Sequence, residues 1–445
     1  MTEQSCLREF SRYTMLSVLG TLGVSCYILA DTFFISKGLG ANGLTALNLA
    51  IPVYNFIHGT GLMLGMGGAT RFTVCKSQGK EFRGNQVYVH TIYLGLLFGA
   101  VFFQLGLFGS RPLAAVLGAD AQVLELTDTY LRWLLLFGPA FVFNDIFLCF
   151  VRNDESPQLS MMAMLIGSFA NIVLDYIFIF PLEMGIFGAI LATGCSPIIS
   201  MALMLPHWIQ KKNTFHFCRM RPRVRIAGNV LALGVPSLIA QISTGIVIIT
   251  FNYIIMSLEG NVGVAAYGVI ANIALVILAV FTGIAQGSQP LLSRFHGKND
   301  QKQMKKVLRY GMFTMVVLSV LLYLLTFFFA DPITAIFNTE GRARLQQIAV
   351  QGLKLYFISN VFAGYNIILS IFFTSVEKAV PAQVLSVLRG LILIIPIAFL
   401  LAAALGMTGV WLAYPVTEGI VALLGWVICR FYWRNIRTGR KVGGI

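Results

Sequence analysis

Residues 230–257 read VLALGVPSLIAQISTGIVIITFNYIIMS, a stretch without a single charged residue. A helix needs about 20 apolar residues to cross the hydrocarbon core of a bilayer, so this stretch is long enough to span it. Comparable apolar stretches recur along the whole chain, and they predict twelve membrane-spanning helices. The predicted ranges are 13–36, 45–70, 86–109, 122–150, 158–180, 185–209, 230–257, 263–291, 308–329, 345–373, 382–403 and 407–429.

The amino-acid composition supports a membrane environment. Of the 445 residues, 57% are hydrophobic and 11% are charged, and the mean hydropathy is +0.79. About 25% of the residues in a typical soluble domain are charged, so water is a poor solvent for most of this surface. The apolar stretches leave no room for a separate soluble core. We therefore predict an all-α integral membrane protein.

The basic residues are unevenly distributed among the loops between the predicted helices. The formal net charge is +14, and 25 of the 32 Lys and Arg residues fall at the termini or in alternate loops, against four in the intervening loops. Cytoplasmic loops of membrane proteins carry such an excess, so we expect both termini in the cytoplasm and the chain in the cell membrane. The excess of positive charge therefore reflects the orientation of the chain in the membrane. We expect membrane lipid around the chain and no nucleic-acid partner.

Two pairs of similar segments divide the chain into halves. Gly43-Leu-Thr-Ala46 resembles Gly263-Val-Ala-Ala266, and the pattern Gly-x-x-Gly-x-x-Leu-Ala begins at both Gly185 and Gly406. The two patterns lie 142 residues apart in the first half and 143 in the second. With six helices each, the halves point the same way, which predicts two six-helix bundles related by a pseudo-two-fold axis along the membrane normal. The predicted lobes are residues 1–215 and 216–445.

Two acidic residues fall inside predicted helices, where an Asp costs about 2.5–3.5 kcal/mol to insert into the bilayer. Asp31 lies about 18 residues into the first helix and Asp175 about 17 into the fifth. Both helices run outward, so at about 1.5 Å per residue the two carboxylates reach about the same height and can share one site. The repeat aligns Asp31 with Phe251 and Asp175 with Ile395 or Pro396. The acidic site is therefore confined to the first half.

Polar residues near the two carboxylates complete a set of oxygen ligands. Asn171 precedes Asp175 by four residues and Tyr27 precedes Asp31 by four, so each pair shares a helical face. Thr193 lies at a comparable depth on the sixth helix. Such oxygens suit a hard cation such as Na⁺, and without one the two carboxylates cannot easily both stay ionised, so a proton can serve instead. The alternative is that these polar groups only hold the helices together.

The other charged residues inside predicted helices are expected to have structural roles. Asp145 lies near the cytoplasmic end of the fourth helix, and Glu418 lies at a depth that allows an ion pair with Arg389. Lys354 either attracts an anionic group or extends its amine to the membrane interface. Small residues four apart predict close contacts between helices. They are Gly61-x-x-x-Gly65 and Gly95-x-x-x-Gly99.

Several short motifs together resemble those of the MATE family, the multidrug and toxic compound extrusion transporters. They are Ala30-Asp-Thr-Phe-Phe-Ile35, Gly43-Leu-Thr-Ala46, the turn from Arg152 to Pro157, and Asn171-Ile-Val-Leu-Asp175. Each motif is weak alone, but their order and spacing are typical of the family, and the resemblance runs through both halves. The chain is most similar to bacterial-type members with the cation site in the N-terminal lobe.

The resemblance implies a fold, an activity and a site. It implies two six-helix lobes around a central cleft, and alternating access that exports drug-like organic compounds, often cationic, in exchange for H⁺ or Na⁺. The coupling cation is then bound by Asp31, Asn171, Asp175 and Thr193, with Tyr27 contacting the substrate or supporting these ligands. No other metal or cofactor and no enzymatic activity is implied, and we expect the protein to act as a monomer.

Three other functions stand as alternatives. A lipid-linked oligosaccharide flippase of related architecture needs several cations in its cavity to hold a pyrophosphate, and the helices offer only Arg132, Lys354 and Arg389. An intramembrane enzyme needs a nucleophile or a metal set, but the five histidines form no His-Glu-x-x-His motif and the sequence has no Gly-rich phosphate loop. A channel leaves the buried acidic site unexplained. A cation-coupled exporter accounts best for the sequence.

Overall fold

The computed structural model describes residues 3–338 and 341–437 of the chain. Within these ranges all regular secondary structure is helical, without any strand. Nine of the described helices are long and apolar enough to cross a membrane, and the bent pair formed by α4 (Leu124–Leu136) and α5 (Gly138–Asn153) makes a tenth. Two of the nine are of double length, which brings the number of membrane crossings to twelve.

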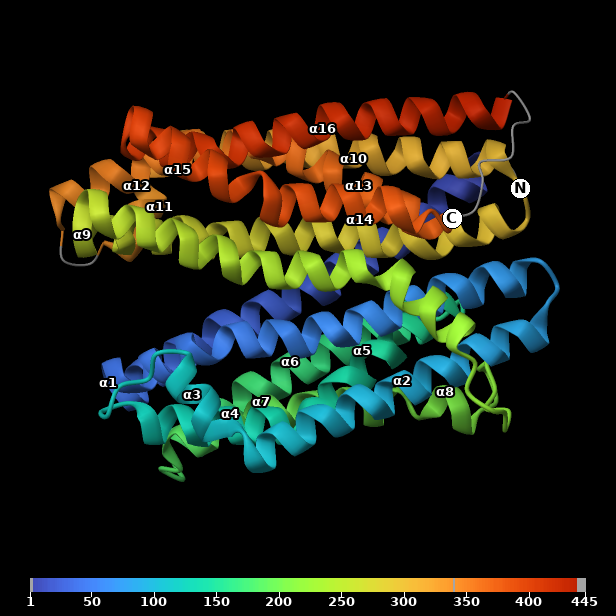
Figure 1. The fold of residues 1–445 in the computed structure, drawn as a ribbon, viewed down its shortest axis with the longest axis horizontal. Helices are drawn as coiled ribbons and strands as arrows, with labels where there is room; N and C mark the ends of the chain where they lie inside the picture. Colours follow the sequence, from blue (N-terminus) through green and yellow to red (C-terminus); the bar gives the residue numbers. More distant parts are fainter. Residues whose placement is uncertain (1–2, 339–340, 438–445) are drawn as a thin grey trace. The chain divides into compact units, whose positions relative to one another are not determined.

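The double-length helices are α1 (Glu3–Ser77) and α9 (Val224–Gly297), with 75 and 74 residues. A straight helix of that size would be roughly 110 Å long, more than three times the thickness of the hydrocarbon core. Each is broken by one glycine with a positive φ, Gly40 (φ 65°) in α1 and Gly260 (φ 60°) in α9. Side chains disfavour this conformation, so glycine permits the reversal. Figure 1 shows α1 doubling back on itself.

The remaining crossings agree with the predicted ranges, and the twelve-helix membrane fold is confirmed. The α4–α5 crossing is bent by 46°. The other crossings are α2 (Glu81–Phe108), α6 (Pro157–Ile179), α7 (Gly185–Met204), α10 (Gln301–Phe328), α12 (Ala343–Tyr356) with η1 (Phe357–Ser359) and α13 (Asn360–Ser375), α14 (Ala379–Val387) with η2 (Leu388–Ile392) and α15 (Ile394–Leu405), and α16 (Met407–Arg437). Short helices occupy the segments α3 (Ser110–Val116), α8 (Pro206–Ile209) and α11 (Ala330–Phe337).

One segment between two predicted helices is itself largely helical. The predicted ranges end one helix at residue 291 and begin the next at residue 308, but α9 continues to Gly297 and α10 begins at Gln301. Only a tight turn separates them, with Asn299 in the left-handed region at φ 56°. The prediction failed because a helix that projects beyond the bilayer keeps its backbone hydrogen bonds while its side chains become polar. The segment between α8 and α9, by contrast, lacks regular secondary structure from residue 210 to residue 223.

The chain groups into two compact units. The first comprises residues up to 245 with 282–307 and 374–377, and the second comprises 246–281, 308–373 and the residues from 378 onward. Ion pairs show why two segments of the second half belong to the first unit. Arg294 pairs with Glu9 at 2.6 Å, and Glu377 pairs with Arg71. The grouping follows such local contacts, and the predicted lobe boundary between residues 215 and 216 stays a prediction.

The predicted close contacts at small residues are confirmed in the first unit. A Cβ added at Gly61 would lie 2.5 Å from Asp145 Oδ2, and one at Gly65 would lie 2.8 Å from the Asp145 carbonyl oxygen. Side chains on α5 thus pack directly against the backbone of α1. Gly95 on α2 makes a similar approach, because its Cβ would lie 2.9 Å from the Ile146 side chain. Glycine is needed at these positions to let the helices approach.

Candidate cation site

Helices α1, α6 and α7 bring the predicted cation ligands together inside the first unit. Asp31 lies on the first half of α1, Asn171 and Asp175 on α6, and Thr193 on α7. All four are buried, with exposed fractions of 6% for Asp31, 3% for Thr193 and 0% for Asn171 and Asp175. Asp31 and Asp175 are close enough to interact electrostatically, and their equal depth in the membrane stays a prediction.

Asn171 connects the carboxylate of α6 to helix α7. In the amide orientation that satisfies both of its ends, Asn171 donates a hydrogen bond to Asp175 Oδ2 at 3.0 Å and accepts one from the backbone N–H of Thr193 at 3.2 Å. The Thr193 hydroxyl donates to the carbonyl of Ala189 at 3.1 Å, which leaves its lone pairs available. The hydrogen-bonding partners determine the orientation of the Asn171 amide. In this orientation Asn171 holds the carboxylate of Asp175 close to Thr193.

Two carboxylate oxygens in this cluster have no hydrogen-bond donor among the described residues. They are Oδ1 of Asp31 and Oδ1 of Asp175, both inaccessible to solvent. The two acids are also close enough to interact electrostatically. A buried carboxylate without a partner costs several kcal/mol, and two that repel each other cost more. The residues therefore fit a bound cation, either a proton or Na⁺, that supplies the missing positive charge.

Two tyrosines, Tyr27 and Tyr130, lie near the cluster. The Tyr27 hydroxyl lies 2.6 Å from the hydroxyl of Tyr54, which lies on the second half of α1. Tyr130, on α4, lies close enough to Thr193, Asp31 and Asp175 to interact with them electrostatically. Tyr27 was predicted from its spacing to Asp31. The sequence analysis did not single out Tyr130. A neutral tyrosine can enter the membrane without the insertion cost of an aspartate, so its position in a helix gives no sign of a function.

A second pair of ionisable groups lies beside Tyr54. His58 Nδ1 is 2.8 Å from Asp145 Oδ2, and the His58 ring stacks on the ring of Tyr54 with centroids 6.0 Å apart. Tyr54 thus contacts both Tyr27 and His58, so the pair adjoins the candidate cation site. The sequence placed Asp145 in a structural role. Its contact with His58 was not foreseen, since the two residues lie on helices far apart in the sequence.

Comparison with known proteins now identifies the family. The sequence model of the MatE family matches residues 17–177 and 236–400, well over half of the chain. The chain belongs to the MATE family. The multidrug export protein MepA of Staphylococcus saprophyticus is 24% identical to this MATE protein over 428 residues, which cover 96% of this chain and 94% of the relative. MepA of Staphylococcus aureus strain MRSA252 is 23% identical over 423 residues, covering 95% and 93%.

Solved transporter structures show the same fold. A multidrug resistance MATE family transporter of the MOP superfamily, in an outward-facing conformation, has a TM-score of 0.91 at 23% identity and covers 97% of this chain and 96% of its own. A MOP superfamily transporter from Pyrococcus furiosus has a TM-score of 0.90 at 23% identity, with 96% of each chain covered. As a MATE protein, the chain is a transporter and not an enzyme, and it resides in the cell membrane.

The Arg152 to Pro157 turn, one of the MATE motifs, forms a buried polar network at the end of α5. Arg152 donates a hydrogen bond to Gln286 Oε1 at 2.8 Å. Asn153 donates to Gln289 Oε1 at 2.9 Å and accepts from the Thr73 hydroxyl at 2.9 Å. The motif therefore ties α5 to α1 and to the last turns of α9, a role that its sequence alone did not reveal.

Asp154, just beyond the end of α5, anchors the segment that follows α8. Its carboxylate pairs with Lys76 at 3.0 Å and with His207 at 3.0 Å, and it accepts a hydrogen bond from the backbone N–H of Thr214 at 2.8 Å. Burial by itself raises the pKa of the Asp154 carboxyl. The hydrogen bonds from His207 and Thr214 outweigh burial and lower that pKa to about 2.

The predicted ion pair in the second unit is confirmed. Arg389 Nη2 lies 2.7 Å from Glu418 Oε1, and Asn366 donates a hydrogen bond to Glu418 Oε2 at 2.7 Å. The carboxylate of Glu418 is thus satisfied on both oxygens and joins three helices. Lys354 places its amine over the ring of Phe327, 5.4 Å from the centroid. These charges have protein partners, in contrast to Oδ1 of the two aspartates of the first unit.

Proposed function

We propose that this MATE protein is a secondary active antiporter, which exports drug-like organic compounds, often cationic, in exchange for H⁺ or Na⁺. The observation that carries the proposal is the pair of buried, unsatisfied oxygens on Asp31 and Asp175. A permanent structural role would favour full pairing, whereas a site that loads and releases a cation must leave ligands available. The names of the MepA relatives, which are multidrug export proteins, support the class of substrate.

The proposed mechanism couples cation binding to the packing of α1. A bound cation neutralises Asp31 and Asp175, and its loss restores their mutual repulsion, so the two states favour different packing of α1 against α6. A ligand shifts a conformational equilibrium only through different affinities for the two conformations. We propose that the cation favours one conformation and the drug the other, which gives alternating access. Asn171 and Thr193 hold the cation with the two carboxylates, and Tyr27 supports them or contacts the drug.

Several wider features belong to the same proposal. The lobes comprise residues 1–215 and 216–445, and the protein works as a monomer surrounded by membrane lipid, with both termini in the cytoplasm. The coupling cation is its only cofactor. The supporting observations are the confinement of the acidic site to the first half and the excess of basic residues in alternate loops. Nucleic acid has no place in this function.

The test is export of a fluorescent organic cation from proteoliposomes under an imposed gradient. Asp31→Asn and Asp175→Asn are expected to abolish gradient-driven export, since an amide can neither exchange a proton nor balance the charge of a bound Na⁺. The control is Asp331→Asn, which removes an exposed acid of α11 and should export like the wild type. A sodium gradient alone and a pH gradient alone identify the coupling ion. Intact export by both site variants would refute the proposal.

A lipid-linked oligosaccharide flippase is less well supported by the charges. Arg132 lies near Asp128, 3.4 Å away and partly exposed, and Arg389 is neutralised by Glu418. A pyrophosphate would therefore have to compete with carboxylates already in place. Assays with fluorescent lipid precursors distinguish the two functions directly. Accumulation of substrate against its gradient would likewise exclude a channel.

A further inference from the structure

The segment between α8 and α9 has a defined conformation although it lacks regular secondary structure. Three side chains of the first unit accept hydrogen bonds from its backbone. Asp154 binds the N–H of Thr214, Asn85 binds the N–H of His216 at 2.9 Å, and His90 binds the N–H of Arg223 at 2.8 Å. The conformation of this segment, residues 210–223, is therefore fixed by contacts within the protein and does not depend on a ligand. We call it the connecting loop.

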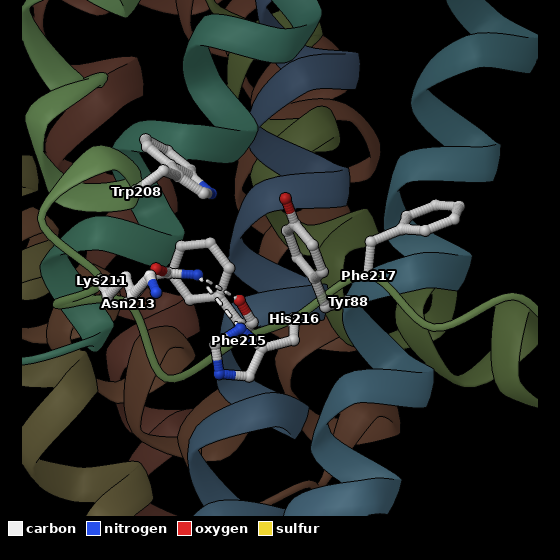
Figure 2. Close-up of a pocket in the computed structure, with 7 residues that line it drawn as sticks. All are labelled: Tyr88, Trp208, Lys211, Asn213, Phe215, His216 and Phe217. Carbon is white, nitrogen blue, oxygen red and sulfur yellow. Dashed lines mark hydrogen bonds between the residues drawn. The ribbon is translucent and has the colours of Figure 1, made fainter.

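The connecting loop encloses a cavity with an aromatic floor. Phe215 is fully buried, and its ring lies 4.7 Å from Tyr88 and 5.5 Å from Trp208 between centroids. The cavity has a volume of about 450 Å³. Figure 2 shows the rings of Trp208 and Tyr88 near the ring of Phe215. The polar lining is provided by Lys211, Asn213 and His216, with Phe217 as the remaining wall.

The connecting loop and the segments that flank it in the sequence carry charge of one sign. The chain has no Asp or Glu from residue 184 to residue 258, and this stretch includes six basic residues. They are Lys211, Lys212, Arg219, Arg221, Arg223 and Arg225. Asp154, which accepts a hydrogen bond from the loop at Thr214, is paired with Lys76 and His207. The cavity therefore opens into a positive potential that attracts an anion.

Exposed apolar side chains stand among these basic residues. The exposed fraction is 75% for Ile209, 61% for Phe217 and 89% for Val224. In water such exposure would be unfavourable, but α7 and α8 end a membrane crossing directly before the loop. Apolar side chains beside Lys and Arg are the pattern of a segment that lies in the headgroup region of a bilayer. The exposed side chains of the loop are therefore suited to contact with lipid headgroups.

We propose that the connecting loop binds the headgroup of an anionic phospholipid of the surrounding membrane. The Lys211 amine faces the lipid phosphate, and Asn213 and His216 supply polar contacts at the rim. Trp208 and Phe217 cover the glycerol and the first carbons of the acyl chains. Charge complementarity selects an anionic over a zwitterionic lipid, because a zwitterion gains little in a potential of uniform sign. This site is separate from the proposed transport function.

The test uses the purified full chain in detergent, titrated with brominated phosphatidylglycerol or brominated phosphatidylcholine. Bromine quenches nearby tryptophan, and Trp208 lies in the cavity. The protein has five tryptophans, so the difference between wild type and Trp208→Phe isolates the Trp208 signal. We expect that signal to be quenched at lower concentrations of phosphatidylglycerol than of phosphatidylcholine.

Lys211→Asn is the decisive variant. Lys211 has a left-handed backbone with φ 54°, which Asn tolerates well, so the substitution removes charge without adding strain. One basic residue near the surface contributes about 1 kcal/mol, so half-saturation with phosphatidylglycerol should rise about fivefold. The control is Lys302→Asn, which removes an exposed Lys at the start of α10 and should leave half-saturation unchanged.

Three results would overturn the proposal. Equal quenching of Trp208 by the two lipids would show that charge does not select the ligand. If Lys302→Asn raised the half-saturating concentration of phosphatidylglycerol as much as Lys211→Asn does, general surface charge, and not this cavity, would attract the lipid. Full displacement of the lipid by inorganic phosphate would identify a site for the free anion. None of these measurements depends on transport, so a failure of the proposed antiport would leave the test intact.

Discussion

Gly234→Ala should weaken the crossing of α1 and α9. Gly234 faces Met63, and a Cβ added there would lie 2.6 Å from the Met63 carbonyl carbon and would overlap the carbonyl oxygen. Carbon atoms in good contact are about 3.5–4.0 Å apart, so the two helices must separate by about 1 Å. The obstacle is backbone, which cannot rotate away as a side chain would. The opposite helix has a matching glycine, Gly67, whose Cβ would overlap the carbonyl of Val230.

The expected cost follows from two opposing effects. Overpacking a tight contact typically costs about 1–3 kcal/mol. Replacing glycine by alanine inside a helix returns roughly 0.5–1 kcal/mol through the lower entropy of the unfolded chain. Gly245→Ala is the matched control on the same helix, because the nearest atom to its Cβ would be Asn55 Nδ2 at 3.6 Å. Gly234→Ala should therefore be less stable than Gly245→Ala by about 1–3 kcal/mol.

Thermal unfolding of the two purified variants in the same detergent measures this difference, and export from proteoliposomes follows its effect on transport. We expect Gly234→Ala to unfold at a lower temperature than both the wild type and Gly245→Ala. Its export rate should change as well, because the α1–α9 crossing cannot close as before. Equal unfolding temperatures and equal export for the two variants would refute the claim that backbone contact at Gly234 sets the packing of these helices.

Three further substitutions test single contacts. Asp154→Asn should lower the unfolding temperature at neutral pH. The pKa of Asp154 is held at about 2, below its ordinary value, so the ionised carboxylate contributes to stability above about pH 4. The difference in unfolding temperature from the wild type should therefore shrink as the pH falls towards 2. Glu418→Gln should destabilise by about 3–5 kcal/mol, since it leaves Arg389 buried and unpaired, whereas adding Arg389→Gln should recover part of the loss in a double-mutant cycle. Tyr27→Phe should cost about 1 kcal/mol in unfolding free energy by removing the hydroxyl contact with Tyr54, and an unchanged stability would show that this contact contributes nothing.

The sequence allowed the fold to be predicted, and it allowed the two acids of the candidate site to be selected, for physical reasons. A bilayer requires long apolar helices, so the crossings are visible as uninterrupted apolar stretches. The reversals at Gly40 and Gly260 fall between predicted helices. Glycine is found there because it adopts a positive φ easily. Asp31 and Asp175 were found because a charge in a membrane helix demands a reason, and their depths could be compared along helices of known rise.

The contacts that the sequence did not predict join residues without such a signal. Tyr130 approaches Thr193 and the aspartates from α4, but a tyrosine in an apolar helix is unremarkable by composition. The network at Arg152 needs Gln286, which is 134 residues away, and no pattern along the chain indicates that these two residues meet. Partners of this kind are chosen by the packing of helices, which depends on the shapes of many side chains at once.

Helix α1 connects the candidate site to a second tight contact. Asp31 lies about 13 residues, or roughly 20 Å of helix, from Val18. There a Cβ at Gly283 of α9 would lie 2.6 Å from Val18 Cα, and one turn further a Cβ at Gly287 would lie 2.6 Å from Thr14 Cα. Packed interfaces of this kind switch between discrete arrangements and do not deform continuously. A repacking of α1 on neutralisation of Asp31 must therefore either keep this crossing whole or separate it, so a change of charge in the site can act at the opposite end of the same helix.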